Sequence, residues 1–529
     1  MEKRLFLAFV LSFFILFTWN KMFPQQKNGE IVTKEIIEEK ADLTIPPPLP
    51  IIERKEERLS FLGNEKIEIE ITNLGASIKS VRLAEYNSNL PITEINSLKQ
   101  YKDVTFIETY KTANKIIFQY KANDIAISKS YELDGYLVKT DTRIENSREM
   151  SIEEKVEIQA FKLDISRLDK EGINPRDKML QEYSIANDLQ IYRKKNAFKI
   201  SKKDYRVEID NINWIGFRNR YFCAILMPQY NIEKYEIIPI ENQELSITLS
   251  AKTEKLGQID TQEYQNIIYF GPQDINVLKS YDLGFERIIN YKIGGFFDIM
   301  AFGLTDFVAK IILRYLNFLN KIIDNLGIAI IILAISISVV TYPFTHKSMM
   351  SMKKMQAIQP KLSKIREQYK NNPQKLNKEM MELYKENKVN PFGGCLPMLF
   401  QMPIFIGLYQ VLWRSASLKG ASFLWIKDLS EPDRLFILNN TLPIIGNEIN
   451  ILPILMMIVM FFQQKISSKN MVVADPQQAQ QQKMMMMFMP LMIGFIFYKF
   501  ASGLALYFTT FYILSTLTHL RMSKIKKAV

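Results

Sequence analysis

The chain has 529 residues, enough for several domains, and its two halves differ in composition. The first half is charged and rich in Lys, Glu, Ile and Asn, whereas long apolar runs and most methionines lie in the second half. The net charge of +12 is concentrated in segments beside these apolar runs. That placement indicates the cytoplasmic loops of a membrane protein and argues against DNA as a partner.

Residue types that carry much of enzyme chemistry are scarce. The two cysteines, Cys223 and Cys395, fall on opposite sides of the membrane in the predicted topology, so we expect no disulfide between them. The only histidines in the sequence are His346 and His519. We therefore expect no metal site and no cofactor, and we identify no catalytic residue.

A charge-free run over residues 5–19 follows Lys3 and Arg4. Its length also suits a cleavable signal peptide, but the small residues of a cleavage site do not follow it. We predict an uncleaved signal anchor over residues 1–22. Residues 23–56, which include IPPPLP, are predicted to form an extended linker.

Residues 57–285 alternate apolar and polar residues with a period of two, most clearly in EKIEIEITNLGASIKSVRL. This alternation is typical of half-buried antiparallel strands, with Ile67, Ile69 and Ile71 on one face. We predict an all-β sandwich domain outside the membrane. Residues 286–325 are apolar but interrupted by basic residues, which is typical of an amphipathic helix lying in the membrane interface.

Five apolar segments follow, and together with the anchor they predict an α-helical membrane protein with six spans and a large extracytoplasmic all-β sandwich domain. These segments are residues 326–345, 393–416, 449–464, 484–500 and 501–520. Three basic segments accompany them and are predicted to be cytoplasmic: a helical hairpin at 346–392, a loop at 465–483 and a tail at 521–529. Segment 417–448 is balanced in charge and predicted to be periplasmic, so both termini would be cytoplasmic.

The hairpin prediction rests on spacing and on a capping pattern. Apolar residues recur at helical spacing before position 370, and Asn372 with Pro373 then has the pattern of an N-cap followed by a first-turn proline. Ribosomal RNA is a polyanion, so we predict ribosome contact by basic side chains of this hairpin. The candidates are Lys353, Lys354, Lys361 and Lys364. The alternative is a solvated charged loop held by lipid headgroups.

Three stretches carry more specific patterns: TYPFTHKSMMSMKKMQAIQPK, NPFGGCLPMLFQMPIFIGLY and DPQQAQQQKMMMMFMPLMIGFIFYKFASGLALYFTT. In this order they closely resemble the YidC/Oxa family of membrane protein insertases. The resemblance covers roughly residues 290–529, and weaker matches, NWIGFRNRYFCAILMP and YFGPQD, precede it. A large exported β domain ahead of the core is similar to the branch of the family found in bacteria with two membranes.

The resemblance implies a five-helix insertase core around a hydrophilic groove that opens to the cytoplasm and to lipid. Polar parts of a nascent membrane protein would enter this groove, while its apolar segment moves past the spans at 393–416 and 484–500. It implies an insertase and chaperone of the bacterial inner membrane, acting alone or with the Sec translocon, with no covalent chemistry and no small-molecule substrate.

Two groups of residues are candidates for contact with clients. The residues expected to line the groove are Ser338, Thr341, Gln401, Tyr507, Thr509 and Tyr512. The residues expected to contact clients on the two spans are Pro397, Met402, Met489 and Pro490. Simpler roles remain open: the prolines as packing kinks, Gln401 bonding to a neighbouring helix, Ser338 bonding back to a helix carbonyl, and the methionines as apolar filler.

The chain departs from the family pattern at one position. The family usually has an arginine four residues before the Tyr342, Pro343 pair, where this sequence has Ser338 within the uncharged stretch IIILAISISVVTYPF. We therefore predict a groove that works by polarity and hydration without a fixed positive charge. If a cation does reach the groove, Lys347 and Arg414 are the first candidates.

Two other classes of protein are alternatives to the insertase. A solute transporter would be expected to show inverted repeats or paired intramembrane charges, and the sequence shows neither. A membrane-anchored sugar-modifying enzyme would need acid and base groups in the β domain, where histidine is absent but carboxylates could serve.

Overall fold

The computed structural model describes residues 56–122, 125–146, 152–153, 156–164, 181–195, 205–207, 212–241, 244–251, 255–256, 260–291, 303–370, 372–390, 396–442, 446–469 and 476–525. The predicted signal anchor, 1–22, and nearly all of the predicted linker, 23–56, lie outside the described residues. The described part of the chain begins at Glu56.

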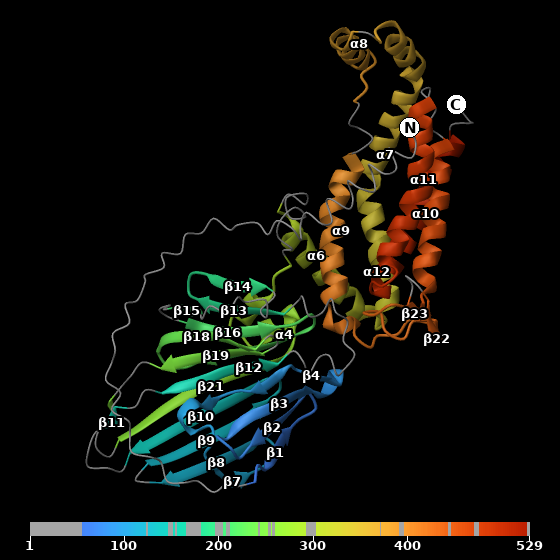
Figure 1. Cartoon of the computed structure of the whole chain (residues 1–529). Coiled ribbons are helices and arrows are strands. Elements are labelled where there is room, and N and C mark those ends of the chain that lie inside the picture. The colour runs from blue at the N-terminus through green and yellow to red at the C-terminus, as the bar shows by residue number, and fades with distance from the viewer. Residues whose placement is uncertain are drawn as a thin grey trace. The chain divides into compact units, whose positions relative to one another are not determined.

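Antiparallel strands make up most of the described residues between positions 59 and 272, as the alternating pattern predicts (Figure 1). The nine strands of the largest sheet, in spatial order, are β14 (Ile191–Lys195), β13 (Glu182–Asn187), β16 (Ile212–Arg218), β17 (Phe222–Pro228), β21 (Asp260–Pro272), β10 (Leu137–Asn146), β9 (Ile125–Asp134), β8 (Lys115–Ala122) and β7 (Ile107–Lys111).

Smaller sheets complete this β-sandwich. The six-stranded sheet contains β15 (Tyr205–Val207), β18 (Ile232–Glu241), β19 (Glu244–Ala251), β12 (Glu157–Asp164) and β5 (Ile92–Glu94), with β6 (Ser97–Leu98) paired to β12. The four-stranded sheet contains β1 (Leu59–Gly63), β2 (Ile67–Thr72), β3 (Ser77–Leu83) and β4 (Ser88–Asn89), and β11 (Ile152–Glu153) pairs with β20 (Lys255–Leu256).

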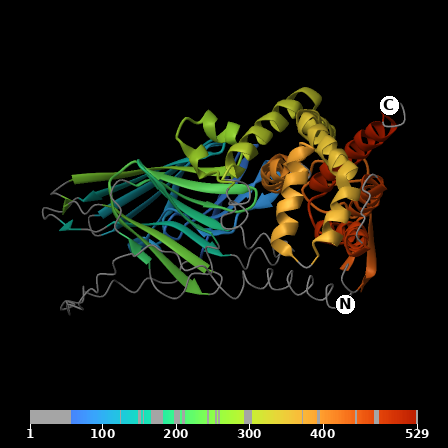
Figure 2. The ribbon, with the colours of Figure 1, turned by 90° about the horizontal axis from the view of Figure 1, so that it is seen from above.

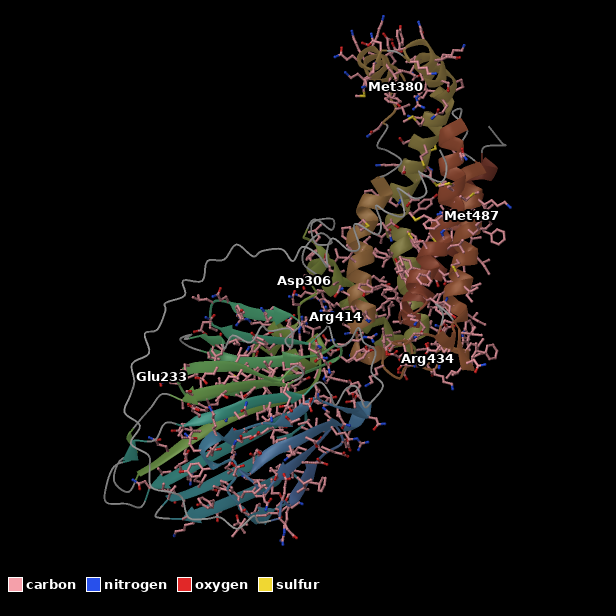
Figure 3. All side chains as sticks on the ribbon, viewed as in Figure 1. Glu233, Asp306, Met380, Arg414, Arg434 and Met487 are labelled. Atoms are coloured by element: carbon pink, nitrogen blue, oxygen red, sulfur yellow. The ribbon has the colours of Figure 1, made fainter. Side chains whose placement is uncertain are left out.

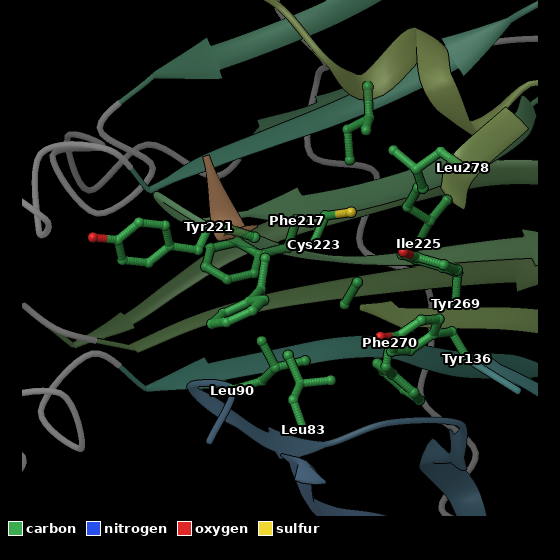
Figure 4. Packing of buried hydrophobic residues seen from close by; sticks show 14 of the residues in the cluster. Leu83, Leu90, Tyr136, Phe217, Tyr221, Cys223, Ile225, Tyr269, Phe270 and Leu278 are labelled. Carbon is green, nitrogen blue, oxygen red and sulfur yellow. The ribbon is translucent and has the colours of Figure 1, made fainter. Parts of the chain in front are cut away.

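The sandwich core follows from the period-two pattern. Ile67, Ile69 and Ile71 of β2 are fully buried, whereas Glu68 between them is exposed, because successive side chains of a strand point to opposite faces. Figure 4 shows part of this core, in which Phe217 of β16 and Tyr269 of β21 belong to one buried cluster with aliphatic side chains. Burial of this apolar surface stabilises the domain.

Helix α6 (Thr305–Ile323) lies within the segment predicted to be interfacial, 286–325. One face, which includes Leu316, is buried against α7 and α9, and the other exposes Phe307, Phe318 and Ile322. The short helix α4 (Ile275–Ser280) precedes it, and the Asp274 side chain caps α4 by accepting backbone N–H groups.

Helix α7 (Leu326–Gln368) is longer than predicted, with 43 residues. The sequence suggested a span at 326–345 and a separate first helix of the hairpin, but the two are one continuous helix. The reason is local: residues 346–352 contain no glycine, proline or N-cap pattern, and a change from apolar to polar surroundings does not by itself end a helix.

The hairpin turn itself is as predicted. Asn372 caps α8 (Pro373–Glu386) by accepting the Lys375 N–H at 3.1 Å, and Pro373 occupies the first turn. Ile358 and Leu362 of α7 are buried together with Leu383 of α8, so the two helices share a small core of their own.

The remaining helices are α9 (Leu396–Arg414), α10 (Ile451–Lys469), α11 (Pro476–Phe497) and α12 (Ser502–Ile525). Helix α11 begins eight residues before the predicted span at 484, because PQQAQQQ offers a first-turn proline followed by good helix formers. Between α9 and α10, strands β22 (Phe436–Leu442) and β23 (Gly446–Ile449) pair as a hairpin within the segment predicted to be periplasmic, 417–448.

Helices α7, α9, α10, α11 and α12 run alongside one another and form the helix bundle (Figures 1 and 2). We call the end near α8 the hairpin end, and the end near β22 and β23 the loop end. By length and composition, one helix among the described residues, Leu326–Met355, is suited to cross a membrane. Shorter apolar stretches occur at Ile451–Ser467 and Met486–Phe497.

Candidate functional site

A hollow of about 680 Å³ lies between α7 and α12. Each helix contributes side chains spaced i, i+3, i+4 and i+7, and α12 adds Leu520 beside this stripe, so two stripes face each other across the hollow. The lining residues are Ile335, Ser338, Val339 and Tyr342 from α7, and Leu514, Leu517, Thr518, Leu520 and Arg521 from α12. The walls are therefore mainly apolar, with a few hydroxyl groups and one cation.

The hollow is closed toward the loop end. There α7 and α12 pack closely, and Ile330 of α7 and Ala505 of α12 are both fully buried. Toward the hairpin end, side chains that line the hollow are exposed: Val339 of α7 is 66% exposed and Leu517 of α12 is 54% exposed. The site is thus a blind hollow whose open part lies in the half of the bundle nearest α8.

Ser338 lines this hollow while its hydroxyl donates to the Ala334 carbonyl at 2.7 Å. Ser338 therefore faces the hollow and also bonds back along its own helix, and its contact with clients stays a prediction. Thr341 likewise bonds to the Ile337 carbonyl at 2.8 Å. Ser336 lies on a different face of α7, where its hydroxyl pairs with that of Tyr315 at 2.8 Å.

Among the described residues that line the hollow, Arg521 alone is charged. Sequence analysis missed it, because it was assigned to a basic tail, 521–529. Helix α12 continues to Ile525, so Arg521 falls seven residues after Leu514 and on the same face. The seven-residue spacing from Leu514 places Arg521 on that face of α12. The sequence does not show that α7 lies opposite this face.

The two cations suggested from the sequence are placed elsewhere. The Arg414 guanidinium donates to the Asn290 carbonyl at 2.9 Å, at the end of α9 remote from Met380 of the hairpin (Figure 3). Lys347 is exposed and is not among the residues that line the hollow. Proposing Arg414 for the groove was wrong, because the direction of α9 carries its last residue to the loop end.

Gln401 of α9 and Tyr507 of α12 form a second polar feature, deeper in the bundle. Their side chains lie beside each other, and Tyr507 is fully buried. Within the part of the chain that the structure describes, neither Gln401 Nε2 nor the Tyr507 hydroxyl has a hydrogen-bond partner. An unpaired buried donor costs about 1–3 kcal/mol. This pair therefore destabilises the bundle unless another group accepts its hydrogen bonds.

Thr509 and Tyr512 do not line the hollow. Thr509 is buried in the closed half, where its hydroxyl donates to the Ala505 carbonyl at 2.7 Å, and Tyr512 packs against Phe508 and Phe511. Client contact by Thr509 and Tyr512 therefore stays a prediction, separate from this hollow.

The residues predicted to contact clients differ in exposure. Met402 and Met489 are half-buried and Pro490 is buried, whereas Met487 of α11 is 62% exposed (Figure 3). The side chain of Pro397 lies outside the described residues. Met487 was not one of the four residues named from the sequence, but it lies in the same methionine run and is more exposed than the three of them whose side chains the structure describes.

The hairpin lysines are placed where a polyanion could reach them. Lys354, Lys361 and Lys364 are exposed and Lys353 is half-buried, on the part of α7 that carries the small core shared with α8. A hollow of about 360 Å³ on α8 and the residues after it includes Lys385 and Lys388.

The arrangement defines a class of protein: a β-sandwich joined to a helix bundle that contains a blind, mainly apolar hollow with a cation at its open end. Residues 93–305 match the family described as YidC periplasmic domain, and residues 318–528 match the family described as 60Kd inner membrane protein.

Related proteins agree along almost the whole chain. Membrane protein insertase YidC of Endomicrobium trichonymphae is 30% identical over 533 residues, which cover 96% of each chain. Membrane protein insertase YidC of Geotalea daltonii is 27% identical and covers 83% of this chain and 87% of its own. The chain therefore belongs to the YidC family of membrane protein insertases, whose members are inner membrane proteins.

Solved structures give weaker likenesses. An active YidC insertase crystal structure is 18% identical, covers 88% of this chain and 92% of its own, and has a TM-score of 0.37. A galactose mutarotase-like protein from Lactobacillus casei is 9% identical, covers 40% of this chain and all of its own, and has a TM-score of 0.33.

Proposed function

We propose that this protein inserts other membrane proteins into the inner membrane by sheltering their polar segments in the hollow between α7 and α12. The observation that carries the proposal is the one-sided closure: the hollow is sealed by buried side chains toward the loop end and open toward the hairpin end. A segment that enters from the hairpin end would partly cross the membrane without passing fully through hydrocarbon.

The energetic reason is the cost of unpaired polar groups in lipid. Each backbone or side-chain polar group that enters hydrocarbon without a partner costs several kcal/mol. Ser338, Thr518 and the Arg521 guanidinium supply hydrogen-bonding groups beside apolar walls, so a client's polar residues find partners while its apolar residues contact Leu514 and Leu517. No bond is made or broken in this process.

Gln401 and Tyr507 would extend this role to the closed half of the bundle when its helices part around a client, because Tyr507 is fully buried in the structure. A client carbonyl beside them would accept the hydrogen bonds that the Gln401 amide and Tyr507 hydroxyl do not make within the described chain. Met402, Met489 and Met487 on α9 and α11 would present flexible apolar side chains to varied sequences.

The proposed topology follows from the basic hairpin. Its lysines support a cytoplasmic location for the hairpin end, which would leave the β-sandwich and the β22–β23 hairpin on the periplasmic side, with five helices of the bundle as spans. A cytoplasmic hairpin would meet ribosomes that carry nascent membrane proteins. Cooperation with the Sec translocon is part of the same proposal.

Photo-crosslinking of a stalled, ribosome-bound single-span client tests the function. Probes would replace Ser338 and Thr518 in the hollow and Met487 on α11, with Tyr192 of the β-sandwich as a matched exposed control. We expect crosslinks from the first three positions and none from Tyr192. Crosslinks only from Tyr192 would contradict the proposal and favour a role centred on the β-sandwich.

A further inference from the structure

Residues 423–433, which we call the cap segment, lie across the loop end of the bundle. The cap segment packs on α7 through Phe423: a Cβ atom at Gly327 would lie 2.1 Å from the Phe423 ring, so the approach requires glycine. It packs on α12 through Leu429, which is fully buried and whose carbonyl accepts the Gly503 N–H at 2.9 Å.

The cap segment also supplies partners for helix N-termini. The Asp433 carboxylate accepts the N–H groups of Ile451 and Leu452, both at 2.9 Å, in the first turn of α10. The Glu431 carbonyl accepts the Ser502 N–H at 2.8 Å at the start of α12. The first N–H groups of a helix have no partner within it, so these bonds fix where α10 and α12 begin.

One side chain of the β-sandwich reaches this segment. Arg220 lies in the turn between β16 and β17 and is buried. Its Nε donates to the Trp413 carbonyl at 2.7 Å, and its Nη2 donates to the Ser430 carbonyl at 2.8 Å. Its Nη1 lies 3.5 Å from the Glu431 carboxylate.

The surroundings of Arg220 suit a guanidinium in particular. Trp413 is near the C-terminal end of α9, where carbonyl groups lack helical partners and the helix dipole favours a cation. The group also lies over the rings of Tyr221 and Trp413, with centroids at 4.6 and 5.5 Å. A planar group with several donors can meet all these partners at once, whereas an ammonium cannot.

We propose that Arg220 is a positioning residue through which the β-sandwich holds the cap segment, and thereby the closed loop end of the bundle, in place. Arg220 ties the end of α9 to the cap segment, and the cap segment is bonded to α10 and α12 and packed on α7. The β-sandwich therefore stabilises the closure that the hollow requires. The importance of this closure for the hollow rests on the proposed function, whereas the positioning role of Arg220 does not.

Hydrogen–deuterium exchange of the full-length protein in lipid nanodiscs tests the inference without any client. The amides to follow are those of Ser502 and Gly503, which donate to the cap segment. We expect Arg220→Ala to raise their exchange rate about tenfold, because bonds from a charged donor that fix the segment are lost. Arg220→Lys should give an intermediate rate, since it keeps the charge but not the fork of donors.

Arg143→Ala is the matched control, because Arg143 forms an exposed ion pair with Glu263 on the β-sandwich and should leave both amides unchanged. Amides of β10 (Leu137–Asn146) report whether the sandwich stays folded. Unchanged exchange at Ser502 and Gly503 in a folded Arg220→Ala protein would overturn the inference, as would an equal increase in Arg143→Ala. If Arg220→Ala does not fold, Arg220→Lys decides: a rate equal to that of the parent protein overturns it.

Discussion

Ser338 of α7 and Arg521 of α12 line the same hollow, the first as a hydroxyl already bonded to Ala334 and the second as its cation at the hairpin end. A single buried arginine would supply both a hydrogen-bonding group and a positive charge. Here Ser338 supplies the polar group and Arg521 supplies the charge. The polar group lies on one wall of the hollow, and the charge lies near its opening, where water and salt ions screen it.

Replacing Ser338 by leucine should impair insertion. The larger apolar side chain would fill part of the hollow and remove a polar group, so clients with polar tails that must cross the membrane should insert several-fold less well. Ser338→Arg should be tolerated and should favour acidic tails. Protease protection of clients with matched tails measures both, and normal insertion by Ser338→Leu would count against a role for the hollow.

Replacing Arg521 by glutamine should reduce the preference for acidic tails. A charge pair about 8 Å apart at an effective dielectric constant of about 20 gives about 2 kcal/mol, and screening reduces it, so a roughly tenfold effect is expected at low salt. Arg521→Lys is the control that keeps the charge. An unchanged ratio of acidic-tail to neutral-tail insertion in Arg521→Gln would show that the cation takes no part in client selection.

Replacing Tyr507 by phenylalanine separates a structural from a functional role. The hydroxyl is buried without a partner among the described residues. Its removal should therefore leave the free energy of unfolding unchanged or raise it by about 1 kcal/mol. Insertion should nevertheless fall, since a client loses that donor. Gln401→Leu should likewise keep its stability and lose insertion activity. Full insertion activity in both variants would assign the pair to packing alone.

Charge reversal on the hairpin should weaken ribosome binding. Exchange of Lys353, Lys354, Lys361 and Lys364 for glutamate replaces attraction to RNA by repulsion, and the remaining binding should depend less steeply on salt. Co-sedimentation with ribosomes measures this. Asn372→Ala, which removes the α8 cap at a cost of about 1 kcal/mol but keeps the charge, is the control. If the charge-reversed protein bound ribosomes at low salt as well as the parent protein does, the prediction would be refuted.

Stability of the β-sandwich should rise with pH above neutrality. Lys129 is buried among β strands and donates to the carbonyls of Gly75 and Asn96, and burial lowers its pKa to about 7. Between pH 7 and the unfolded pKa of about 10.4, Lys129 is protonated in the unfolded chain but mostly neutral in the folded protein. Each pH unit in this window should therefore add up to roughly 1.4 kcal/mol to the free energy of unfolding.

The urea midpoint of Trp214 fluorescence in the full-length protein measures this slope, with the other tryptophans replaced by phenylalanine. Lys129→Met should flatten it, because a methionine does not titrate. The same pH dependence in Lys129→Met would assign the effect to another group.

Several features of this protein follow from the sequence alone. The alternation around Ile67, Ile69 and Ile71 is sufficient to predict β2, because a strand has one buried face whatever it packs against. Asn372 and Pro373 predict the start of α8, because capping is satisfied by residues within one turn. The specific motifs identify the family, and the 96% coverage of a relative confirms it.

Other features were decided only by tertiary structure. Arg521 faces the hollow because α7 lies opposite that face of α12, and Arg414 lies far from it because α9 runs toward the loop end. Thr509 and Tyr512 were predicted to line the groove and are not among the residues that line the hollow between α7 and α12. Arg220 meets Trp413 and Ser430 across about two hundred positions of sequence. Period and propensity act over a few residues and fix which face of an element is polar, whereas the neighbour of that face depends on how the elements pack.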